Sequence, residues 1–132
     1  SWIRVERVET REDKGNDYFV VDDVETLRYV ANLASIPLHV WASRIGNIDR
    51  PDWCILDLDP KEAPLSSVVA IAQTIRELCD EIALPVFAKT SGKTGLHLLI
   101  PMGKGFTYTQ QKLLGELLAR LVEARVPGIA TT

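Results

Sequence analysis

Apolar and polar positions along the chain follow two periods, which predict strands and helices in turn. Short alternating or continuous apolar runs between turn residues are typical of strands. Three longer segments repeat apolar residues at helical spacing. The predicted strands cover residues 2–9, 18–21, 36–41, 53–59, 85–88 and 96–100, and the predicted helices start near residues 23, 67 and 108 and run to about 34, 82 and past 121.

The order of these elements, two strands followed by a helix three times, predicts an α+β fold. Helices would pack on a mixed, largely antiparallel sheet. The short connection between strands 85–88 and 96–100 favours a hairpin, and therefore antiparallel pairing there. Side chains suited to cap the three helices precede each one: Asp22 or Asp23, Ser66 or Ser67, and Thr107 or Thr109.

Composition places the chain among ordinary globular proteins. Its 132 residues are 46% apolar and 25% charged, with a net charge of −3, so neither wholesale disorder nor a general affinity for nucleic acid is indicated. Cys54 and Cys79 lack metal-binding spacing and sit in apolar stretches, which predicts reduced core thiols of a cytosolic protein. No apolar run approaches the roughly 18 residues of a membrane span, so we expect no membrane partner.

The stretch Asp57-Leu58-Asp59-Pro60 ends an apolar strand with two acids. Alternate strand residues share a face, so Asp57 and Asp59 should point the same way, roughly 6–7 Å apart. Two such carboxylates repel unless a cation lies between them, and paired aspartates suit Mg²⁺ or Mn²⁺ in phosphoryl transfer. The alternative is a simple strand end entering a turn, where Asp-Pro is common.

The loop Lys89-Thr-Ser-Gly-Lys-Thr-Gly95 contains Gly-Lys-Thr but is not a P-loop. The glycine that a P-loop requires is replaced by Phe87, and an apolar strand follows where a P-loop would begin a helix. The loop still suits phosphate. Hydroxyl, backbone amide and cationic donors come from Ser91, Gly92, Gly95, Lys89 and Lys93, with His97 just beyond. The alternative is a glycine-containing hairpin with solvated lysines.

Three segments taken together resemble the polymerase domain of bacterial ligase D, a branch of the archaeo-eukaryotic primase superfamily. They are His39-Val-Trp-Ala-Ser-Arg44, residues 49–60 with Asp-Leu-Asp-Pro, and residues 87–102 with Lys-Thr-Ser-Gly-Lys-Thr-Gly-Leu-His. The resemblance covers essentially the whole chain and implies a primase-type, RRM-like catalytic core. It implies nucleotidyl transfer to DNA 3′ ends in double-strand-break end joining, with Mn²⁺ or Mg²⁺ as cofactor, in the bacterial cytoplasm at the nucleoid.

The resemblance also assigns roles to residues. Asp57 and Asp59 would be the catalytic metal ligands. His39, Ser91, Gly92, Lys93, Gly95 and His97 would bind the nucleoside triphosphate. The implied partners are the triphosphate, DNA ends, a Ku-type end-binding protein and a ligase domain.

The chain departs from the family pattern at two positions and holds only part of the family's domain. Leu38 stands where the family has Glu, and Lys93 lies one residue earlier than the family's hairpin lysine. The N-terminal part and a third metal carboxylate, on a strand past residue 132, would lie outside 1–132, so this core portion is expected to be inactive alone. Two alternatives remain: a degenerate module that binds nucleotide or DNA ends, and another Asp-pair phosphotransferase or nuclease.

Overall fold

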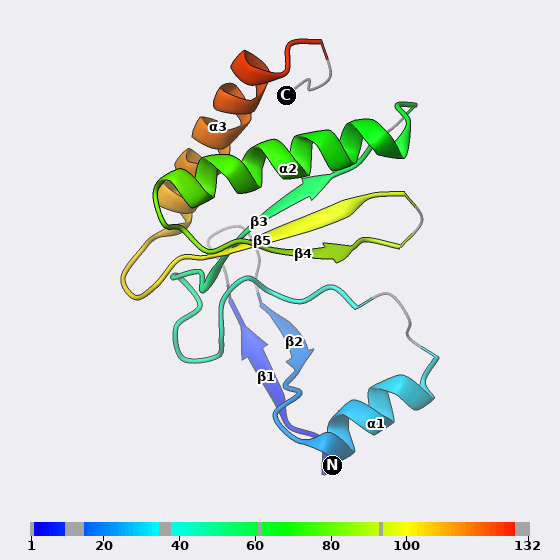
Figure 1. The fold of residues 1–132 in the computed structure, drawn as a ribbon. Helices are drawn as coiled ribbons and strands as arrows, with labels where there is room; N and C mark the ends of the chain where they lie inside the picture. Colours follow the sequence, from blue (N-terminus) through cyan, green and yellow to red (C-terminus); the bar gives the residue numbers. More distant parts are fainter. Residues whose placement is uncertain (1, 10–14, 35–37, 61, 93, 129–132) are drawn as a thin grey trace. The chain divides into compact units, whose positions relative to one another are not determined.

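A computed structural model of the chain describes residues 2–9, 15–34, 38–60, 62–92 and 94–128 (Figure 1). The chain divides into two compact units, Ser1–Trp41 and Ala42–Thr132. Within the described ranges, no helix is long and apolar enough to cross a membrane.

The first unit contains a small hairpin and one helix. Strands β1 (Val5–Val8) and β2 (Asn16–Phe19) pair antiparallel, and helix α1 (Val24–Asn32) follows. Of the two predicted cap residues, Asp22 and Asp23, it is Asp23 that caps α1. Its Oδ1 accepts a 2.6 Å hydrogen bond from the Thr26 backbone N–H. That bond is the main reason why the pKa of Asp23 lies below its usual range. Thr26 and Val30 form the buried side of the helix.

The prediction of a strand at residues 36–41 is wrong for residues 38–41, which are the part of this segment that the structure describes. Residues 38–41 form no strand, and residues 36 and 37 lie outside the described ranges. Alternating apolar residues indicate a strand only when another strand is available for backbone pairing. Here Leu38, His39 and Val40 are exposed, and Trp41 instead makes an edge-to-face contact with Tyr18 at 5.3 Å between ring centroids.

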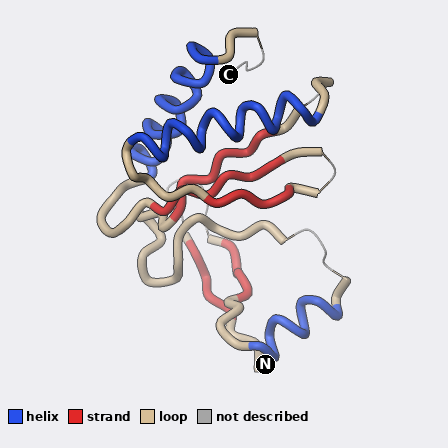
Figure 2. Tube along the Cα trace, in the orientation of Figure 1, coloured by secondary structure: helices blue, strands red, loops and turns tan. Residues whose placement is uncertain are grey.

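The second unit is a three-stranded sheet with two helices on one face (Figures 1 and 2). Its elements are β3 (Trp53–Leu58), α2 (Leu65–Glu81), β4 (Phe87–Thr90), β5 (Leu96–Pro101) and α3 (Tyr108–Arg125). The strand order is β3-β5-β4, and both pairs are antiparallel, which confirms the predicted 85–100 hairpin. The α+β prediction with a largely antiparallel sheet is confirmed, since all described strand pairs are antiparallel.

The core of the second unit lies between the sheet and its two helices. Its buried members are Cys54, Ile75, Leu78, Cys79, Leu98, Ile100, Met102, Leu118 and Val122. Both cysteines are free and buried, as predicted, and burial raises the pKa of each thiol. The apolar residues that recur at helical spacing along α3 are only partly buried, because Leu113 and Leu117 are 64% and 53% exposed.

Two helix starts test the predicted caps. Thr107 forms a capping box with Gln110 at the start of α3, so it, and not Thr109, is the cap. Helix α2 begins at Leu65, earlier than predicted, with Pro64 at the cap position and no side-chain cap bond. Ser66 and Ser67 therefore lie within the first turn and cannot act as the cap.

Candidate functional site

Asp57 lies on the face of the sheet that α2 and α3 leave uncovered in their own unit. Side chains of β3 alternate between faces. Cys54, Leu56 and Leu58 belong to or pack against the helix-covered core. Trp53 and Asp57 therefore point to the opposite face, and the Asp57 side chain is 68% exposed. Its carboxylate is accessible to a cation or a substrate.

Strand pairing places three polar side chains in one row on this open face. Asp57 of β3 is opposite His97 of β5, which is opposite Lys89 of β4. His97 Nε2 lies 3.3 Å from Asp57 Oδ1. The acid strand and the Gly-Leu-His strand, which are far apart in sequence, thus form one site.

Asp59 lies just beyond the end of β3, so the predicted strand 53–59 is one residue too long. Leu58 pairs with Leu96, the first residue of β5, and the ladder stops there because the hairpin turn precedes Leu96. Strict alternation therefore no longer fixes the direction of the Asp59 side chain relative to Asp57. Asp59 still follows Asp57 at the same end of the strand.

The loop between β4 and β5 closes tightly against the end of β3. The Ser91 N–H donates to the Gly95 carbonyl at 3.0 Å. Gly95 is buried, and a Cβ there would clash with Ser91 Oγ and lie 3.0 Å from the Leu58 carbonyl oxygen. Gly92 has a φ of +138°, which favours glycine. Lys93 lies outside the described residues. The loop leads into β5, not a helix, which agrees with the rejection of a P-loop.

The structure brings together only part of the predicted set. Asp57, His97 and the loop from Ser91 to Gly95 belong to the second unit, whereas His39 is an exposed residue of the first unit. Across the described ranges, no three His, Cys, Asp or Glu side chains are grouped so that they could hold a metal. The Asp57–His97 pairing was not predicted, because the register between β3 and β5 has no local sequence signal.

Comparison with known proteins identifies the family. A family model described as LigD, primase-polymerase domain, matches residues 1–132. The chain belongs to this family. The match confirms the resemblance of the motifs at residues 39–44, 49–60 and 87–102 to ligase D.

Individual relatives agree with this LigD primase-polymerase assignment. The chain is 33% identical over 115 residues to the multifunctional non-homologous end joining protein LigD of Pseudomonas aeruginosa, covering 83% of this chain and 14% of the relative. It is 28% identical over 122 residues to the bifunctional LigD of Bacillus subtilis, covering 91% and 20% respectively. The chain thus spans about a fifth or less of these two relatives.

A solved structure shows the same fold. The polymerase domain of Mycobacterium tuberculosis ligase D, in complex with DNA, matches with a TM-score of 0.81 at 25% identity. The match covers 96% of this chain and 47% of the solved chain.

Proposed function

We propose that residues 1–132 are a core portion of a primase-like polymerase domain that transfers nucleotides to DNA 3′ ends in end joining. The observation that carries the proposal is the open-face row of Asp57, His97 and Lys89, in a chain of the LigD primase-polymerase family. The LigD names of the relatives and the DNA in the solved polymerase domain support DNA as the partner. A Ku-type protein and a ligase domain remain expected partners, and the bacterial cytoplasm the expected location.

The donor set at the end of β3 fits a hard divalent cation. Asp57 presents an exposed carboxylate, and Asp59 follows two residues later. Magnesium and manganese are commonly held by one or two carboxylates together with waters and substrate phosphates. A cation held there would make the primer 3′-hydroxyl more acidic and would offset the negative charge of the leaving pyrophosphate. The third carboxylate, expected on a strand past residue 132, stays a prediction.

The chain's own residues would position the triphosphate for in-line attack. The primer 3′-hydroxyl loses its proton to solvent and its oxygen forms a bond to the α-phosphorus, while the bond from that phosphorus to the bridging oxygen breaks and releases pyrophosphate. Lys89 and His97 lie in register with Asp57 and would contact phosphate oxygens. The Ser91 hydroxyl and the amides around Gly92 and Gly95 would add neutral donors. Roles for His39 and Lys93 rest on the family resemblance.

Primer extension tests this function. The protein with its full polymerase domain, supplied with Mn²⁺, a primed DNA and nucleoside triphosphates, should lengthen the primer. Asp57→Asn and Asp59→Asn should each abolish extension. Asp80→Asn is the control, because it removes an equal charge from α2, where Asp80 pairs with Arg76 at the surface.

The outcomes separate the remaining alternatives. No extension by the wild type, with intact binding of DNA ends, would favour a binding module. Shortening of the primer would favour a nuclease, and extension retained by Asp57→Asn would overturn the metal assignment.

A further inference from the structure

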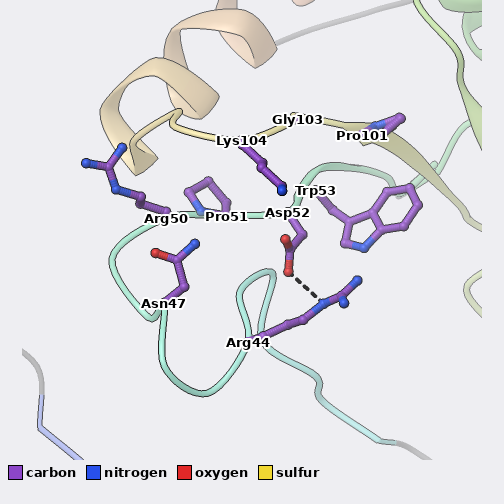
Figure 3. A pocket seen from close by; sticks show the side chains of 9 residues that line it. All are labelled: Arg44, Asn47, Arg50, Pro51, Asp52, Trp53, Pro101, Gly103 and Lys104. Atoms are coloured by element: carbon purple, nitrogen blue, oxygen red, sulfur yellow. Dashed lines mark ion pairs between the residues drawn. The ribbon is translucent and has the colours of Figure 1, made fainter.

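A second polar site lies at the opposite end of the sheet, where β3 begins and β5 ends. A pocket with a volume of about 340 Å³ lies there, and Figure 3 shows the side chains that line it. Its lining comes from the loop before β3 and the turn after β5: Arg44, Asn47, Arg50, Pro51, Asp52, Trp53, Pro101, Gly103 and Lys104. Three cations and one carboxylate make the lining formally +2, in a chain whose net charge is −3. The pocket is therefore locally cationic, although the net charge of the whole chain is negative.

Backbone bonds hold the walls of this pocket in place. The Asp52 N–H donates to the Ala42 carbonyl at 2.8 Å, and the Asp52 carbonyl accepts from Met102 at 2.9 Å, which ties the two walls together. In the second wall, Gly103 and Gly105 have φ values of +69° and +100°, so the turn that presents Lys104 depends on glycine on both sides. The site is formed before any ligand binds, which lowers the entropic cost of binding.

The cationic side chains retain donors for a ligand. Arg44 Nε bonds Asp52 Oδ2 at 3.0 Å, which leaves its terminal nitrogens available. Arg50 Nη1 donates to the Gly105 carbonyl and so anchors the turn. Lys104 has no ion-pair partner among the described residues, and in Figure 3 its amine points into the space above Asp52. A compact anion with several acceptor oxygens, such as a phosphate, matches these donors.

Aromatic side chains beside the pocket favour a nucleic-acid strand as the source of that phosphate. Trp53 lines the pocket and packs edge-to-face on Phe87, with ring centroids 6.2 Å apart. Phe87 is 56% exposed on the open face. Aromatic surfaces next to a cationic groove are the usual means of binding single strands without sequence preference. Trp53 lies four residues before Asp57, about 13 Å along β3, so a strand that passes over both would span more than one nucleotide.

We propose that this pocket binds a backbone phosphate of a single DNA strand, about 13 Å along β3 from Asp57. The choice of DNA as the ligand rests on the proposed function. The pocket itself contains neither of the proposed metal ligands, Asp57 and Asp59. The expected signature is electrostatic: on a single strand, each phosphate contact contributes a slope of about −0.7 to the dependence of log affinity on log salt concentration.

The test compares Lys104→Ala with Lys112→Ala, a lysine on α3 outside the pocket whose partner is Glu116. The probe is a single-stranded oligothymidylate without terminal phosphates, so that only backbone phosphates can bind. For Lys104→Ala the salt slope should become less steep by about 0.7. The fold-loss of affinity between about 50 and 200 mM salt should therefore be roughly 2.6-fold smaller than for the wild type. Lys112→Ala should keep the wild-type slope, and Lys104→Arg should restore it.

Equal slopes for Lys104→Ala and Lys112→Ala would overturn the proposal. So would a Lys104→Ala variant that loses affinity for inorganic pyrophosphate while its DNA slope is unchanged, because the pocket would then bind a free anion. Failure of primer extension with a reduced Lys104→Ala slope would contradict the proposed catalysis and leave the strand site standing. Normal primer extension with an unchanged Lys104→Ala slope would support the proposed catalysis and overturn the strand site.

Discussion

Replacing Gly95 with alanine should damage both the hairpin and the site beside it. The added Cβ would clash with Ser91 Oγ and approach the Leu58 carbonyl oxygen to 3.0 Å. The serine hydroxyl can rotate away, but the Leu58 backbone cannot move freely because Leu58 pairs with Leu96. Overpacking of this kind destabilises folded proteins by about 1–3 kcal/mol. We expect Gly95→Ala to lower the free energy of unfolding within that range.

A double-mutant cycle separates the two clashes. Ser91→Ala removes the oxygen and leaves Ser91 Cβ at 3.5 Å, an ordinary contact. Because the serine hydroxyl can rotate away, Gly95→Ala should keep most of its destabilising effect in the Ser91→Ala background, with a coupling below about 0.5 kcal/mol. Urea unfolding followed by circular dichroism measures all four proteins. If Gly95→Ala alone changes stability by less than about 0.5 kcal/mol, as surface substitutions do, the close approach of loop and strand is refuted.

Three further predictions concern the helices and the core. Thr107→Ala removes the capping box of α3 and should lower the free energy of unfolding by about 1 kcal/mol, whereas Thr109→Ala should have a smaller effect in the same urea assay. Ile100 is fully buried, so Ile100→Ala should be destabilising by about 2–5 kcal/mol, and a loss below 1 kcal/mol would show that the site is not packed. Burial raises the pKa of the Cys54 and Cys79 thiols above the ordinary value of 9.0, so both stay protonated in the folded state. The free energy of unfolding should therefore fall as the pH rises above 9.0, because only the unfolded state then loses these protons. Both thiols should also react slowly with a thiol reagent until the protein unfolds. Rapid labelling of the native protein near pH 7 would contradict this burial.

Local sequence features predicted much of the fold because their physical causes are local. The acidic cap of α1 needs only Asp23 and the amide three residues later, and the hairpin from β4 to β5 needs only a short glycine-containing loop. The predicted strand at 36–41 failed because a strand depends on a partner elsewhere in the chain. Alternation alone cannot show that the segment ending at Trp41 is held by an aromatic contact with Tyr18.

The candidate site was predictable as residue types but not as an arrangement. Asp57 and His97 stood out from their motifs, yet their 3.3 Å contact depends on β5 lying between β3 and β4. The cationic pocket was missed for the same reason, since Arg44 and Lys104 come from segments far apart in sequence. Tertiary pairing, which carries no local signal, created both sites.

Binding of Mn²⁺ to the open face tests the central claim most directly, because it does not depend on catalysis. In amide NMR spectra of the chain, substoichiometric Mn²⁺ should selectively broaden the signals of Asp57, Asp59 and His97. The signals of the first turns of helix α2 should broaden less. The Asp57→Asn substitution should remove the selective broadening. Uniform broadening, or the same selective broadening in Asp57→Asn, would contradict a metal site built on Asp57.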